Sequence, residues 1–169
     1  MEIVVNDTNI LIDLCNAGLL HYCKKLNLEF RTLDVVINEI EVDEQLHAVQ
    51  RIIDEGTLKV YSLSGEQMGT VFQKVAEYEG KCNLSAEDIS VMVYAIDNNC
   101  RLLTGDKTLK TKAILENVKV SGILFLTDML TQENIISNEE MIIALERLLN
   151  SNNRLPKRLI NERIEKLRY

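Results

Sequence analysis

The chain has 169 residues, 46% of them hydrophobic, with a single proline, seven glycines and a formal net charge of −7. This composition is typical of one compact globular domain and excludes a low-complexity chain. No apolar stretch reaches the roughly 18 residues of a membrane span, and the start lacks the features of a signal peptide, so we expect a cytoplasmic protein without a membrane partner.

Short apolar runs of strand length alternate with helical stretches along the chain. The runs that predict strands are 3–5, 30–33, 58–63, 101–104 and 118–120. The stretches that predict helices are 8–15, 18–25, 35–55, 64–79, 85–97, 107–116 and most of 122–169, with breaks near 134–138 and 150–153. Two helix starts carry capping-box spacing, Ser64 with Gln67 and Ser85 with Asp88.

This order of elements predicts an α/β fold with three layers, α/β/α, around a mostly parallel central sheet. The run Ile3–Val5 is continuously apolar, as expected for a strand buried on both faces. We expect a single domain over residues 1–169, in which 122–169 form a helical C-terminal extension. In such sheets, ligands bind outside the carboxyl ends of the strands.

Four acids stand at or near positions that face this edge of the predicted sheet: Asp7, Glu39, Asp88 and Asp106. If they gather there, each pair of carboxylates repels by about 3 kcal/mol at ~5 Å and an effective dielectric of ~20. A divalent cation would relieve that repulsion, and Mg²⁺ or Mn²⁺ suits oxygen ligands best. Taken singly, Asp7 and Asp106 could instead be simple helix caps, Asp88 a first-turn acid and Glu39 a solvated helix residue.

Basic residues form two groups in an otherwise acidic chain. Residues 151–169 contain six basic and two acidic side chains, and a smaller group flanks Asp106, namely Arg101, Lys107, Lys110 and Lys112. Each group is either a solvated helix face or a contact for phosphates. The four cysteines and two histidines show no metal-binding or catalytic spacing.

Four ordered motifs resemble those of the PIN-domain family. They are Asp7-Thr8-Asn9-Ile10-Leu11-Ile12, Val35-Val36-Ile37-Asn38-Glu39-Ile40, Leu84-Ser85-Ala86-Glu87-Asp88, and Leu102-Leu103-Thr104-Gly105-Asp106-Lys107. The end of the chain, including Asn153-Arg154-Leu155-Pro156, is similar to one subgroup of that family. The resemblance covers nearly the whole chain.

The resemblance implies a metal-dependent ribonuclease, and proteins of this family are frequently the toxins of VapBC-type toxin–antitoxin pairs. Asp7, Glu39, Asp88 and Asp106 would be the catalytic, metal-binding acids, with Thr8, Asn9 and Thr104 as polar residues supporting them. Lys107 and Lys110 are candidates for contacts to RNA. The implied partners are a small antitoxin and a second copy of the chain in a homodimer. The apolar stripe of Met129, Leu130 and Ile135 could serve the dimer, or it could instead belong to the core.

Several alternatives stay open from the sequence. Glu87 competes with Asp88, and Asp34 competes with Glu39, for a place in the acidic site. The chain could also be a PIN fold that mainly binds nucleic acid or protein. A phosphatase is a further alternative, although an aspartyl nucleophile usually comes in Asp-x-Asp and the third position here is Asn9.

Overall fold

The structure is a computed structural model that describes residues 1–152 and 154–169. Its strands are β1 (Glu2–Asn6), β2 (Leu28–Leu33), β3 (Leu58–Tyr61), β4 (Arg101–Leu103) and β5 (Val120–Ser121). They form one sheet in the order β3-β2-β1-β4-β5, and all of the neighbouring strands run parallel. The central β1 pairs with β2 on one side, where Val4 lies beside Phe30, and with β4 on the other, where Val5 lies beside Leu102. The prediction of a parallel α/β sheet is confirmed.

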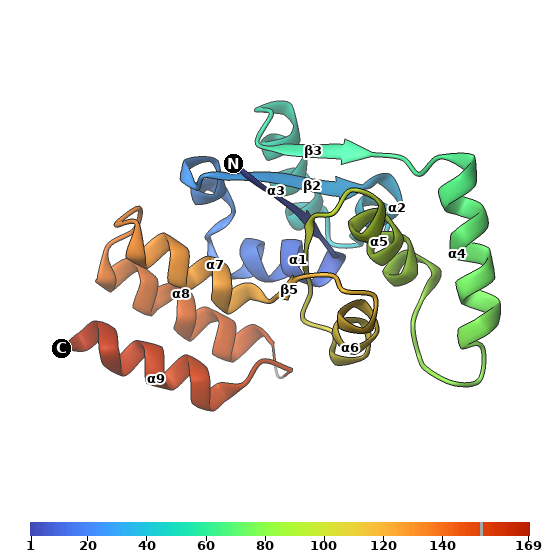
Figure 1. The fold of residues 1–169 in the computed structure, drawn as a ribbon. Helices are drawn as coiled ribbons and strands as arrows, with labels where there is room; N and C mark the ends of the chain where they lie inside the picture. Colours follow the sequence, from blue (N-terminus) through green and yellow to red (C-terminus); the bar gives the residue numbers. More distant parts are fainter. Residues whose placement is uncertain (153) are drawn as a thin grey trace.

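Helices cover the two faces of this sheet (Figure 1). They are α1 (Thr8–Ala17), the 3₁₀ helix η1 (Leu20–Lys25), α2 (Asp34–Ile37), α3 (Asp43–Asp54), α4 (Gly65–Tyr78), α5 (Ala86–Asp97), α6 (Lys107–Leu115), α7 (Ile123–Gln132), α8 (Asn138–Ser151) and α9 (Lys157–Arg168). Helix α1 packs against α3, α7 and α8, whereas α5 packs against α4 and α6. Right-handed connections place the helices that follow β1 and β2 on one face and those that follow β3 and β4 on the other.

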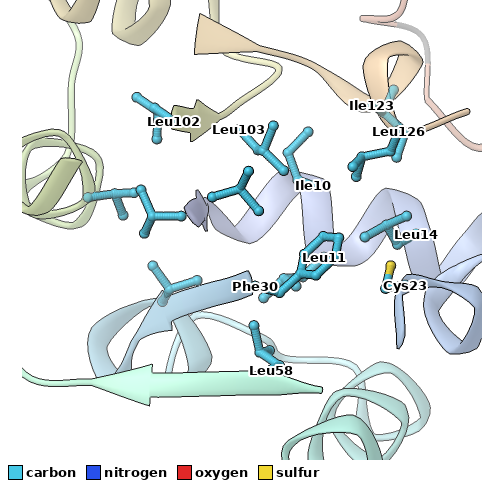
Figure 2. Packing of buried hydrophobic residues seen from close by; sticks show 14 of the residues in the cluster. Ile10, Leu11, Leu14, Cys23, Phe30, Leu58, Leu102, Leu103, Ile123 and Leu126 are labelled. Atoms are coloured by element: carbon cyan, nitrogen blue, oxygen red, sulfur yellow. The ribbon is translucent and has the colours of Figure 1, made fainter. Parts of the chain in front are cut away.

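The hydrophobic core joins the sheet to helices from both halves of the chain. Figure 2 shows Ile10 and Leu14 of α1 together with Leu103 of β4 and Leu126 of α7, and all four side chains are at most 1% exposed. Buried residues of α8 and α9, including Leu148 and Ile160, belong to the same cluster. The side chains of 122–169 therefore contribute to the core around β1.

Both predicted capping boxes are present. Ser64 caps α4 with Gln67, and Ser85 caps α5 with Asp88, each with reciprocal side chain to backbone hydrogen bonds. These boxes satisfy backbone N–H groups that a helix start leaves without partners. Local sequence therefore sets where these two helices begin.

The structure differs from the predicted elements at several points, among them β2, which begins at Leu28 and not at residue 30, and β5, which is Val120–Ser121 and not 118–120. The predicted helix over 35–55 is divided into α2 and α3, because residues 38–42 do not continue the helix. The stretch 18–25 contains a 3₁₀ helix, and β3 ends at Tyr61. The predicted break near 150–153 partly lies outside the described residues, which do not include Asn153.

Burial bears on one predicted surface, the apolar stripe of Met129, Leu130 and Ile135. Leu130 is fully buried, and Met129 and Ile135 are half-buried and pack against the hydrophobic cluster. Among the described helices, none combines the length and the apolar character needed to cross a membrane.

Candidate active site at the carboxyl edge of the sheet

Asp7 is a buried carboxylate at the end of the central strand. It caps α1, where its Oδ1 accepts the Ile10 N–H at 2.9 Å, and its own N–H donates to the Leu103 carbonyl at 3.1 Å. The residue is only 3% exposed. Burial raises the pKa of Asp7 to about 7; the hydrogen bonds to Thr104 and Ile10 oppose this rise, and the charges of Asp88 and Asp13 add to it.

Thr104 links Asp7 to Asp106. The Thr104 hydroxyl donates to Asp7 Oδ2. The hydroxyl oxygen of Thr104 also accepts the Asp106 N–H at 3.0 Å. Asp106 caps α6, where its Oδ1 accepts the Leu109 N–H at 2.7 Å. One buried hydroxyl therefore fixes the ends of β1 and β4, and the two acids that follow them, relative to each other.

Glu39 and Thr8 form a second pair at this edge. The Thr8 hydroxyl donates to Glu39 Oε2. Partial burial raises the pKa of Glu39, the Thr8 hydrogen bond opposes that rise, and the charges of Glu87 and Asp88 add to it. The carboxyl of Glu39 thus lies within reach of the charges on the first turn of α5.

The charge of Asp88 acts on two of the other acids. Its Oδ2 accepts the Ser85 N–H at 3.0 Å, and its charge raises the pKa of both Asp7 and Glu39. Glu87, the neighbouring acid, acts in this way on Glu39. Asp34, the rival of Glu39, instead accepts a hydrogen bond from the Ser62 hydroxyl at 2.5 Å.

The donor chemistry at this edge fits a hard divalent cation. Carboxylate oxygens are the ligands that such ions take, and the repulsion acting on Asp7 and Glu39 is what a cation would relieve. The side chains do not form a closed cage, however: the described part of the chain contains no group of three His, Cys, Asp or Glu residues that could hold a metal ion. An ion bound here would need water or substrate oxygens among its ligands.

The other predicted residues do not all lie at the carboxyl edge of the sheet. Asn9 is half-buried in the first turn of α1, and Lys107 and Lys110 are exposed on α6, which starts beside Asp106. Arg101 lies at the amino end of β4, where it pairs with Glu2 at 2.9 Å. The predicted basic group is therefore split between opposite ends of the sheet.

Two buried polar residues were missed by the sequence reasoning. Asn6 is fully buried, its Nδ2 donates to the Arg31 carbonyl at 3.0 Å, and its Oδ1 has no hydrogen-bond partner within the described residues. Asp13 is 3% exposed and accepts hydrogen bonds from Asn152 Nδ2 at 2.9 and 3.2 Å. The signal for Asn6 was a polar residue in an apolar strand, whereas nothing local connected Asp13 with Asn152.

Sequence comparison shows the family to which the chain belongs. The PIN domain family model DUF3368 matches residues 3–168, and the chain belongs to this family. It is 34% identical over 97 residues to the Endoribonuclease Nob1 of Methanocaldococcus jannaschii. That match covers 57% of this chain and 47% of Nob1, so the chain spans about half the length of this relative.

Solved structures share the fold. A chain in the crystal structure of VapBC2 from Rickettsia felis, bound to a DNA fragment from their promoter, superposes with a TM-score of 0.52 at 18% identity, covering 71% of this chain and 98% of that one. PAE2754 from Pyrobaculum aerophilum superposes with a TM-score of 0.50 at 21% identity, covering 75% and 93%. Both likenesses agree with a PIN-type α/β/α fold.

Proposed function

We propose that the protein is an endoribonuclease that hydrolyses RNA phosphodiester bonds with the help of Mg²⁺ or Mn²⁺. The observation that carries this proposal is the buried Asp7 carboxylate, which Thr104 ties to Asp106 and which lies within the field of Asp88. Membership of the PIN family and the partial match to Endoribonuclease Nob1 support it.

In this proposal the chain's own residues divide the work. Asp7, Asp88 and Asp106 would supply carboxylate oxygens to the ion beside water or substrate oxygens, and Glu39 would be a further ligand or the group that orients a water molecule. When bound, Mg²⁺ or Mn²⁺ supplies Lewis acidity and lowers the pKa of a bound water.

The remaining residues hold these acids and the substrate in place. Thr104 keeps two of the carboxylates in position, and Thr8 does the same for Glu39. Asn9 is a further polar support in the first turn of α1. The exposed Lys107 and Lys110 neutralise phosphates of the RNA, which the acids alone would repel.

The test is cleavage of a panel of single-stranded and hairpin RNAs with Mg²⁺, Mn²⁺ or EDTA. We expect wild-type protein to cleave with metal, and EDTA, Asp7→Asn and Asp106→Asn each to abolish cleavage without unfolding the protein. Asp43→Asn is the matched control, because Asp43 is an exposed acid in the first turn of α3 and should leave cleavage unchanged.

Other outcomes of this assay would contradict the proposal. Cleavage retained in Asp7→Asn would overturn the assignment of the acids. RNA binding without cleavage under all metal conditions would indicate a binding module, and turnover of small phosphate esters would indicate a phosphatase.

We further propose that the protein acts in the cytoplasm as a homodimer and that a small antitoxin protein restrains it. The fold shared with a chain of the VapBC2 structure supports the antitoxin. Co-expression with a small protein encoded by an adjacent gene should relieve any growth defect and yield a complex on size exclusion. A protein that causes no growth defect and purifies alone would contradict this partner.

A further inference from the structure

A small cavity opens beside the acidic site, between α2, the end of β3, α4 and α5. Its volume is about 280 Å³. Apolar side chains make most of its wall: Val35, Leu63, Met68, Val71 and Phe72. This volume lies just below the range of cavities that take drug-sized ligands, so the cavity suits a single small ring system.

The polar atoms of the cavity are mainly acceptors. Its polar lining consists of Asp34, Ser62, Glu87 and Ser90. The Ser62 hydroxyl already donates to Asp34 Oδ2 at 2.5 Å, and the Ser90 hydroxyl donates to the Ala86 carbonyl at 2.7 Å. A ligand therefore meets carboxylate and hydroxyl oxygens that can accept hydrogen bonds, and it must bring the donors itself.

The cavity adjoins the acidic site through Glu87. Glu87 lines it and precedes Asp88 in the chain, and the charges of both residues act on Glu39. A substrate whose backbone lies at the acids can thus place an adjoining group in the cavity. The charged side chains that line the cavity are both carboxylates, which would repel a phosphate, so that group is not an anion.

One wall presents an aromatic ring that the fold leaves largely uncovered. Phe72 is 67% exposed and its neighbour Met68 is 47% exposed, on a helix that lies at the outer end of the molecule beyond α5 (Figure 1). Such a ring offers a face on which a planar group can stack, and base–aromatic stacking is worth about 1–3 kcal/mol per base.

We propose that this cavity receives one unpaired base of the RNA, which stacks on Phe72 and donates an amino group to Asp34 and Glu87. A base combines the features that suit this cavity: a flat apolar face, no negative charge, and exocyclic donors at its edge. Cytosine, adenine and guanine carry an exocyclic amino group, and uracil does not, so uracil is disfavoured. This inference rests on the proposed ribonuclease function.

The first test removes the ring. Phe72→Ala is compared with Phe72→Tyr, which keeps an aromatic face, and with Leu115→Ala, which removes a side chain that is 72% exposed on α6. On single-stranded RNA, we expect Phe72→Ala to raise KM about tenfold with kcat little changed, and the other two variants to resemble wild type.

A scan with abasic nucleotides locates the base. Moving one abasic site along the RNA should identify a single position at which its loss raises KM as much as Phe72→Ala does. Combining that RNA with Phe72→Ala should give no further loss, because both changes remove the same contact. Additive effects at every position would overturn the proposal.

The second test concerns the choice of base. At the position found by the scan, wild type should show a higher kcat/KM for cytosine than for uracil, and Asp34→Asn or Glu87→Gln should reduce that ratio. The ratio separates base selection from any general effect of these variants on catalysis. An unchanged ratio in both variants would overturn the role of the carboxylates.

Failure here differs from failure of the proposed function. If wild-type protein cleaves no RNA, the ribonuclease proposal falls. If it cleaves RNA and Phe72→Ala behaves like Leu115→Ala, only the base site falls. If Phe72→Ala leaves RNA kinetics intact but prevents binding of an apolar, basic peptide, the cavity docks a protein instead, and this inference is wrong.

Discussion

At the scale of single residues, the buried carboxyl of Asp7 destabilises the folded protein when it is charged, and interactions elsewhere in the fold offset this loss. A buried acid whose pKa rises to about 7 is disfavoured in its charged form. Because this folded-state pKa lies above the ordinary value of 3.8, the folded protein binds more protons than the unfolded chain between those values. Stability therefore falls as the pH rises from about 4 to 7 and then levels off.

We predict that Asp7→Asn stabilises the metal-free protein at pH 8 and has a much smaller effect at pH 4. The pKa difference corresponds to about 4 kcal/mol at most, at roughly 1.36 kcal/mol per pKa unit. Asn is as good an N-cap as Asp, so α1 should keep its start. Denaturant melts in EDTA at the two pH values measure this, and an equal effect of Asp7→Asn at both would contradict it.

Thr104 should matter through its hydroxyl and not through its shape. Thr104→Val keeps the volume of this buried side chain but removes the donor to Asp7 and the acceptor for the Asp106 N–H. Because two buried polar groups lose a partner, we expect a loss of about 1–3 kcal/mol in the free energy of unfolding and a strong loss of cleavage.

Thr104→Ser keeps the hydroxyl and is the matched control. It should retain cleavage and lose less stability than Thr104→Val. If Thr104→Val retained cleavage and Thr104→Ser lost it, the methyl group rather than the hydroxyl would hold the site.

At the scale of elements, α9 is held by two kinds of contact whose strengths differ. Ile160 is fully buried against the core, while Arg163 makes a two-pronged ion pair with Asp128 at 2.7 and 2.6 Å. The Arg163 and Asp128 side chains are 27% and 39% exposed, so solvent screens that pair.

We therefore predict that Ile160→Ala destabilises the protein by about 2–5 kcal/mol and Arg163→Ala by roughly 1 kcal/mol. Raising the salt concentration should shrink the effect of Arg163→Ala and leave that of Ile160→Ala unchanged. Urea melts at low and high salt measure both. A larger loss for Arg163→Ala would show that the ion pair, and not burial, anchors α9.

An element can be predicted from the sequence when the residues that determine it lie close together in the chain. The starts of α4 and α5 could be predicted because Ser64 with Gln67 and Ser85 with Asp88 are three residues apart. The division of residues 35–55 into two helices could not be predicted. The apolar pattern continues through Ile40, whose side chain is buried in the core.

The same distinction between local and distant residues applies to the candidate site. The four candidate acids could be named from the sequence because each stands in one of its motifs, and their role in catalysis stays a prediction. The resemblance named Thr104 as a support for the acids, but the pairing of its hydroxyl with Asp7 spans 97 positions, and the contact of Asp13 with Asn152 spans 139. Such contacts depend on tertiary packing, which no local pattern reports.

At the scale of the whole molecule, the segment 122–169 should be required for folding. Its buried side chains, including Ile123 and Leu148, pack in the cluster that contains Ile10 and Leu14 of α1. We predict that a chain ending at Ser121 is insoluble or melts without cooperativity, because it exposes that face of α1. A soluble fragment with a cooperative thermal transition would show that 122–169 is a separate unit.

The strand order also dictates when the molecule can become active during synthesis. The central strand β1 can pair with β2 once about thirty residues are free, but its other neighbour, β4, starts only at Arg101. Until β4 arrives, one edge of β1 stays open and Asp7 has no Thr104 beside it. A nascent chain on the ribosome, surrounded by RNA, should therefore be unable to cut until both halves of its sheet have joined.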